Sequence, residues 1–231
     1  MLSKSDSKFR ELIERGIPLE RLEMRLRPKL GLEDWDAERS QHDEFGDYSH
    51  EGFLGIDESL LDVIHGDWEV VERYGTTHQE IAEVLAKAIK TQEMPNPEYT
   101  IQYDLMTAGL QGCPWECKGN YQRGNGLIII YNVQKTSQQD LMAVTMSAMI
   151  GDRRDKMELE MVDRNEAMAS FFSGIPKDTR GLTDRVAVVT ELHPHLIGEH
   201  YFFEGKYSPY RADPRVLIPA LNLSSPVPSP K

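Results

Sequence analysis

Two cysteines and a later group of histidines are the residues of this chain whose types and spacing could bind a metal ion. The only two cysteines among 231 residues lie four positions apart, in Cys113-Pro-Trp-Glu-Cys117. Three histidines follow closely spaced at His193, His195 and His200. Thiolates and imidazoles are ligands that zinc prefers, and a structural zinc site takes four of them. The pattern predicts zinc as a cofactor, bound by Cys113, Cys117, His195 and His200.

The spacing of these ligands resembles that of a ββα zinc finger with a long insertion. His195 and His200 have four residues between them, within the range seen in zinc fingers, and would lie roughly on one face of a helix. However, 77 residues separate Cys117 from His195, where the compact motif has about a dozen. If residues 140–172 are an insertion, the remaining order is turn, strand, strand and helix. We therefore predict that the strand 127–133 pairs with the strand 185–189.

Other interpretations of the same residues stay open. Two cysteines of a cytosolic protein are often small buried apolar residues, and a histidine such as His193 is more often hydrogen-bonded than bound to metal. A hydrolytic zinc ion would leave one coordination position open and would need a nearby carboxylate, for which Glu191, Glu199 and Glu204 are available. The chain has no His-Glu-x-x-His, Gly-x-Ser-x-Gly or phosphate-loop motif. We expect structural rather than catalytic zinc, with a metal-dependent hydrolase as the alternative and no catalytic residue assigned.

Four further polar residues near the histidines could assist the site. They are His193, Glu199, Glu204 and Arg211. We expect Arg211 to form a charge-assisted pair with Asp213, with Glu204 or with a helix C-terminus. A second interpretation has Arg211 and Lys206 binding a small anion together with the histidines.

The first 95 residues are predicted to form a helical region. Two short amphipathic segments flank a break at Gly16-Ile17-Pro18, and residues 31–52 look like a linker. Asp57 is the expected N-cap of a helix that ends at Gly75, and Thr77 with Glu80 forms a capping box for the next helix.

Residues 96–223 are predicted to form a β-rich α+β domain. Alternating apolar residues over 99–105 and an apolar run over 127–133 indicate strands, and Thr190 is the expected N-cap of the helix that carries the histidines. A helical insertion is expected at about 137–180, and a disordered tail at 224–231. The predicted fold class is α+β: N-terminal helices, then a small antiparallel β region with a zinc-finger-like ββα element.

Composition limits the classes of partner. Lys and Arg total 26 against 38 Asp and Glu, which gives a formal net charge of −12 and argues against general nucleic-acid binding. Residues 77–92 resemble the first helix of a helix-turn-helix regulator, but no basic recognition helix follows. No run of about 20 apolar residues occurs, and the polar N-terminus lacks the apolar core of a secretory signal, so we expect a cytoplasmic protein without membrane contact. The methionine-rich helices would suit a homodimer.

Three motifs resemble an uncharacterised family of soluble bacterial proteins. They are the Gly52-Phe-Leu-Gly-x-Asp57 segment, the Gly112-Cys-Pro-Trp turn, and the tail that runs from Leu192-His-Pro-His-Leu-Ile-Gly-Glu-His-Tyr-Phe-Phe-Glu-Gly to Ser-Pro-Tyr-Arg-Ala-Asp-Pro214. The resemblance covers about residues 51–135 and 185–217, and the family usually has Gly where this chain has Tyr201. It implies a cytoplasmic location and the grouping of Cys113 with His195 and His200, and it brings no assigned reaction. Whether this protein is an enzyme is therefore left open.

Overall fold

The computed structural model describes residues 7–27, 52–104, 112–117, 127–150, 185–206, 208 and 210–223. Within these ranges the chain has the predicted α+β fold, with seven helices and one three-stranded antiparallel sheet. Four of the helices precede the sheet in the sequence. None of the described helices combines the length and apolar character that crossing a membrane requires.

The N-terminal helices form a helical hairpin. Helix α1 (Ser7–Glu14) and helix α2 (Leu19–Leu26) are separated at the predicted break, where Gly16 has φ +91°. A backbone with positive φ favours glycine, and Pro18 precedes the first residue of α2 because proline is tolerated where a helix begins. Each helix buries one apolar face, as the sequence pattern indicates.

Two longer helices follow, and the structure confirms all but one of the residues predicted at their ends. Helix α4 (Leu60–Tyr74) ends at Gly75, which has φ +70°, and helix α5 (His78–Thr91) begins after Thr77, whose side chain accepts a hydrogen bond from the Glu80 amide. The expected cap at Asp57 was wrong. The Ser59 hydroxyl accepts from the Asp62 amide instead, because the helix starts two residues later than the sequence pattern indicated.

The sheet contains the strand pairing on which the zinc-site prediction depended. Its order is β1 (Tyr99–Asp104), β2 (Leu127–Asn132) and β3 (Val186–Val189), with both pairs antiparallel. Ile128 lies opposite Val189, which confirms that the strand near residue 130 pairs with the strand near residue 187. Residues 151–184, where most of the expected insertion falls, and the tail 224–231 lie outside the described residues.

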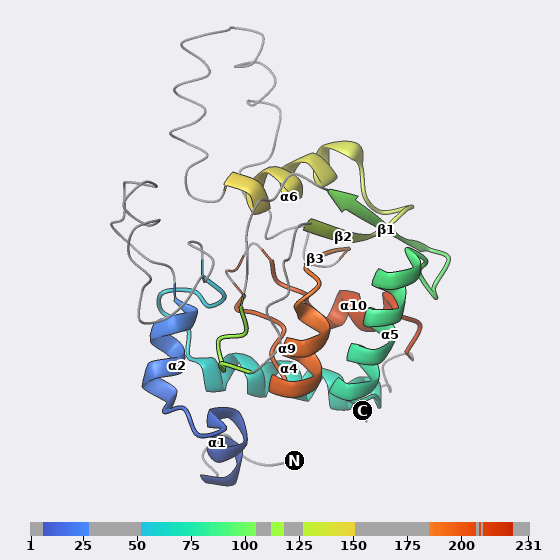
Figure 1. Cartoon of the computed structure of the whole chain (residues 1–231). Coiled ribbons are helices and arrows are strands. Elements are labelled where there is room, and N and C mark those ends of the chain that lie inside the picture. Colours follow the sequence, from blue (N-terminus) through green and yellow to red (C-terminus); the bar gives the residue numbers. More distant parts are fainter. Residues whose placement is uncertain are drawn as a thin grey trace, which may run out of the picture.

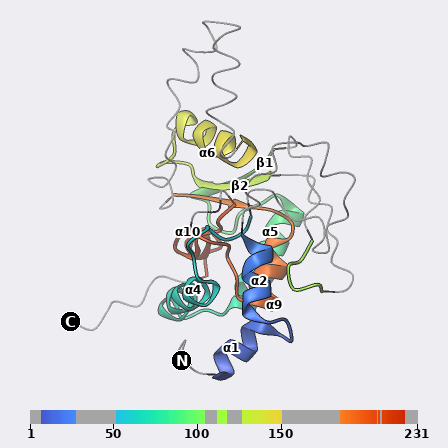
Figure 2. The same ribbon diagram turned by 90° about the vertical axis from the view of Figure 1, so that its left-hand side faces the viewer.

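The sheet lies between two layers of helices. Figures 1 and 2 both show α6 (Gln138–Ile150) on one side of the strands and the helices α4, α5, α9 (His193–His200) and α10 (Pro214–Ala220) on the other. Ile128 and Ile130 face the larger layer, whereas Leu127 and Ile129 pack with α6. Because both faces of β2 are covered, its sequence is a continuous apolar run rather than an alternating one.

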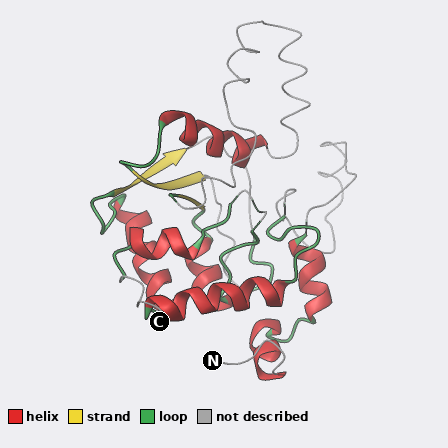
Figure 3. Cartoon of the chain, turned by 180° about the vertical axis from the view of Figure 1, so that it is seen from behind, coloured by secondary structure: helices red, strands yellow, loops and turns green. Residues whose placement is uncertain are grey.

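A second apolar cluster lies away from the sheet and surrounds the candidate site. It joins Phe9, Ile13, Leu22 and Leu26 of the N-terminal hairpin to residues of α4, to Leu192 and Leu196, and to the cysteine-bearing turn. Figure 3 shows from behind how α4 crosses the lower part of the molecule, with the N-terminal hairpin at one of its ends. The hairpin, the cysteine turn and α9 therefore share one core.

Candidate metal centre

The two cysteines lie on a tight turn between β1 and β2 in the sequence. The Glu116 amide donates to the Cys113 carbonyl at 2.9 Å, and Glu116 has φ +57°. This turn brings both thiols to the same side, with Cys113 buried and Cys117 partly buried. The compact turn predicted from Cys113-Pro-Trp-Glu-Cys117 is therefore present.

The two candidate histidine ligands lie on α9. Its N-cap residue is Leu192 rather than the expected Thr190, whose hydroxyl accepts from the Leu192 amide at 3.3 Å and contacts His193 Nδ1 at 3.1 Å. The helix ends at His200, and Tyr201 takes the left-handed conformation with φ +59°. Glycine adopts this conformation more readily than tyrosine does.

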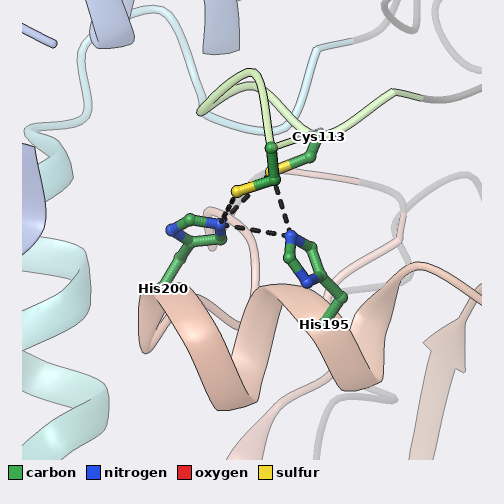
Figure 4. Close-up of side chains that lie close together, drawn as sticks. Cys113, His195 and His200 are labelled. Carbon is green, nitrogen blue, oxygen red and sulfur yellow. Dashed lines mark hydrogen bonds between the residues drawn. The ribbon is translucent and has the colours of Figure 1, made fainter. Parts of the chain in front are cut away.

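The four predicted ligands converge on one point. Cys113 Sγ lies 3.2 Å from both His200 Nε2 and His195 Nε2, and His200 Nε2 lies 3.3 Å from both Cys117 Sγ and His195 Nε2. All four ligand atoms lie within 4.8 Å of one another. Figure 4 shows the rings of His195 and His200 rising from the same side of α9 toward Cys113. Among the described residues, this is the group arranged to hold a metal ion.

The four separations of 3.2–3.3 Å are close to the shorter edges of a tetrahedron around zinc. Bonds of about 2.0–2.3 Å at tetrahedral angles separate the ligand atoms by about 3.3–3.8 Å. Hydrogen bonding alone does not account for the arrangement, because His200 Nε2 has three close neighbours and an imidazole nitrogen offers one proton or one lone pair. A shared cation would satisfy all four groups at once.

Burial keeps Cys113 and both imidazoles in their uncharged forms in the absence of a cation. It raises the pKa of the Cys113 thiol to about 12, although the Trp115 and Cys117 amides oppose that shift. Burial, followed by the neighbouring His195, lowers the pKa of His200 to about 3, and burial also lowers the pKa of His195. The imidazoles are therefore neutral, which is the form that binds metal, and the Cys113 thiol requires a nearby positive charge to ionise.

Two residues to which the sequence analysis assigned no role, Trp115 and Arg25, hold the site in place. The indole of Trp115 stacks on the His200 ring, with centroids 4.2 Å apart and planes 9° apart, and its N–H donates to the Ile13 carbonyl at 2.8 Å. The buried Arg25 guanidinium donates to the Pro114 carbonyl at 3.1 Å and to the Glu116 carboxylate. Arg25 could have been found as the one charged residue on the buried face that α2 forms with Leu22 and Leu26.

The four polar residues that were expected to assist the site bind partners outside the group of candidate ligands. His193 is buried and accepts from the Thr190 amide through Nδ1, so its Nε2–H faces the Tyr210 carbonyl at 2.9 Å. This confirms the hydrogen-bonded interpretation of His193. The Glu199 carboxylate pairs with Arg15 at 3.2 Å on the surface. Glu204 is buried beside His193, with 3.2 Å between Oε1 and Nε2.

Arg211 has a principal partner that the sequence prediction did not include. Its guanidinium forms two hydrogen bonds to Asp67 of α4, at 3.1 and 2.5 Å, and one to the Glu204 carbonyl. The expected Asp213 is more distant, at 3.7 Å. Asp67 lies on the buried stripe of α4 between Val63 and Val71. An acidic residue in an apolar stripe indicates a buried cationic partner.

Comparisons with known proteins give no match: no family model, no curated protein and no solved structure resembles this chain.

Proposed function

We propose that this protein is a structural-zinc module that acts by binding or interaction, with Cys113, Cys117, His195 and His200 as the zinc ligands. The observation that carries the proposal is the convergence of two thiols and two imidazoles at tetrahedral separations. Donor sets of two sulfur and two nitrogen atoms are characteristic of zinc. The resemblance to soluble bacterial proteins, the cytoplasmic location and a homodimer also remain proposals.

The arrangement favours structural zinc over a hydrolytic centre. A catalytic zinc ion keeps a position for water, whereas here four protein side chains would complete a tetrahedron. Two of the three candidate bases are also poorly suited. Glu199 is paired with Arg15, and burial raises the pKa of Glu204 well above its usual range, so that its carboxyl holds a proton. A screen with esterase and phosphatase substrates should show no turnover that depends on the metal.

A helix-turn-helix regulator is also disfavoured. In such a unit a second helix follows the first after a short turn and enters the major groove. In this chain, α5 is followed by β1, which pairs with β2 in the sheet. The buried face of α5 packs in the main core.

Metal analysis of untagged protein tests the proposal. We expect one zinc per chain, and we expect the double variant Cys117→Ser with His200→Ala to lose it. A matched control is His65→Gln: this histidine contacts Glu69 and Phe9 and should leave the zinc content unchanged. With Co²⁺ in place of zinc, the wild type should show the intense absorption bands of a tetrahedral thiolate site. Zinc well below one per chain, or full zinc in the double variant, would contradict the proposal.

A further inference from the structure

The N-terminal hairpin of α1 and α2 contacts the turn that carries both cysteines. Arg25 of α2 donates to the Pro114 carbonyl, and its side chain is completely buried. From α1, the Ile13 carbonyl accepts the indole N–H of Trp115 at 2.8 Å. The hairpin therefore holds the turn at the two residues that lie directly after Cys113.

The same hairpin also contacts the helix that carries both histidines. Arg15, directly after α1, donates to the Glu199 carbonyl at 2.8 Å and pairs with the Glu199 carboxylate at 3.2 Å. Glu199 precedes His200, and the His200 ring stacks against Trp115. Both halves of the ligand set are therefore connected to one structural unit that supplies no ligand itself.

We propose that metal binding and docking of this hairpin are thermodynamically coupled, with Arg25 and Trp115 as the positioning residues that transmit the coupling. The inference rests on the proposed metal site and adds a conformational response to it. With metal bound, the turn and α9 are fixed relative to each other and present the docking surface for α1 and α2. With the metal removed, the two parts can separate, and the hairpin loses contacts on both sides.

Coupling of this kind is reciprocal, so each event strengthens the other by the same factor. The response should be partial, because the hairpin has other contacts. The Leu26 carbonyl accepts the amides of Phe53 and Leu54 at 2.7 and 2.9 Å, and Phe9 packs edge-on against Trp68 of α4. Metal removal should therefore loosen the hairpin without releasing it.

Hydrogen exchange of the 231-residue protein tests whether metal removal loosens the hairpin. We expect amides of residues 9–26 to exchange about 10-fold faster after zinc is removed with a chelator, since coupling factors of about 5–150-fold are typical. Amides of β2, in the other core, should change less than about twofold on the same scale. Unchanged exchange in 9–26 with zinc bound one to one would overturn the inference and leave the proposed function intact. Equal acceleration in β2 would also overturn it, because the whole chain would then depend on metal.

Zinc affinity, measured by competition with a chromogenic chelator, tests whether the contacts of the hairpin strengthen metal binding. We expect Arg25→Gln to weaken zinc binding about 10-fold. Arg10→Gln is the matched control, because among the described residues Arg10 pairs within the hairpin, with Glu14 and Glu20, at 2.8 and 3.1 Å. It should stay within about twofold of the wild type, below the range of typical coupling factors.

A second variant avoids the removal of a buried charge. Trp115→Phe keeps an aromatic ring against His200 but removes the N–H that binds the Ile13 carbonyl. It should also weaken zinc, by about fivefold, while the Co²⁺ absorption bands keep their tetrahedral pattern because all four ligands remain. Wild-type affinity in both Arg25→Gln and Trp115→Phe would overturn the coupling. Failure of the wild type to bind any zinc would instead overturn the proposed function.

Discussion

A buried pair of neutral side chains, His193 and Glu204, lies just beyond the candidate metal centre. Burial lowers the pKa of His193 to about 4 and raises the pKa of Glu204 well above its usual range. The Ser208 hydroxyl donates to Glu204 Oε2 at 2.5 Å, and Arg211 donates to the backbone carbonyl of Glu204 rather than to its carboxyl. With so little compensation for a buried negative charge, the carboxyl holds its proton.

This pair predicts a pH dependence of stability that Glu204→Gln should remove. The folded state keeps the Glu204 proton at pH values where the unfolded chain, with an ordinary pKa of 4.5, has released it. The free energy of unfolding therefore falls as pH rises above that value, by up to about 1.4 kcal/mol per pH unit from this one group. Gln is neutral and similar in shape, so the free energy of unfolding of the variant, relative to that of the wild type, should increase as pH rises. Urea unfolding from pH 5 to 8 measures the free energy of unfolding of both proteins. The same pH dependence in the variant and the wild type would contradict the prediction.

The Arg211 guanidinium is the second residue whose environment predicts a large effect. It is nine-tenths buried and binds Asp67 through two hydrogen bonds. Arg211→Met should destabilise the fold by about 3–5 kcal/mol, because it leaves the Asp67 charge buried without its partner. Adding Asp67→Asn should recover part of that loss. Arg215→Met is the control: Arg215 binds Asp213 at 2.6 Å but is 62% exposed, so its loss should amount to less than about 1 kcal/mol. Similar losses in both single variants would refute this account.

At the scale of elements, the position of α9 depends on its close approach to α5. A Cβ added at Gly198 would lie 2.9 Å from the Ala82 Cβ, a separation at which one backbone must move. Small residues at this crossing allow the two helices to pack, and α9 in turn carries His195 and His200. Gly198→Ala should therefore lower the free energy of unfolding by about 1–3 kcal/mol through overpacking.

Gly66 provides the opposite case in the same fold. It lies inside α4, and an added Cβ would meet no atom within 4 Å. Gly66→Ala should therefore raise the free energy of unfolding by about 0.5–1 kcal/mol, because alanine is the better helix former. Chemical denaturation of both variants tests the pair. If Gly198→Ala proved as stabilising as Gly66→Ala, the close packing of α5 on α9 would be refuted.

The sequence predicted elements best where local signals agree with the tertiary environment. The stop at Gly75, the cap at Thr77 and the strand at 127–132 all combine a local preference with an apolar pattern. The cap expected at Asp57 was wrong because several polar residues there can cap a helix, and Ser59 is the one that does. The cap expected at Thr190 was wrong because α9 begins after Leu192, and the Thr190 hydroxyl accepts from the Leu192 amide and contacts the buried ring of His193 instead.

At the scale of the whole molecule, the sequence contained the ligand types but not the contacts that assemble them. The cysteines and histidines could be recognised because zinc selects particular donors at short spacings. Their convergence across 77 intervening residues depended on the pairing of β2 with β3, which was inferred only by treating the middle of the chain as an insertion. Arg25 could not be assigned a role, because its partners in the cysteine turn are a backbone carbonyl and a carboxylate 89 and 91 positions away.

Metal removal should lower the stability of the core that the N-terminal hairpin shares with the site, because the site joins the cysteine turn to α9 within that core. Zinc at about 1,000 times its dissociation constant would stabilise this part of the folded chain by about 4 kcal/mol. The melting transition of this core should therefore shift by about 8 °C or more.

Differential scanning calorimetry of zinc-loaded and chelator-treated protein measures the change in Tm. Zinc should restore the higher Tm, whereas magnesium should not, because magnesium prefers oxygen ligands. The double variant Cys117→Ser with His200→Ala should melt at the same temperature with or without chelator. A chelator effect of equal size in that variant would assign the stabilisation to some other site. Equal Tm values for the loaded and stripped wild type would mean that the four ligands hold their positions without the ion, through the packing of Trp115 and Arg25 alone.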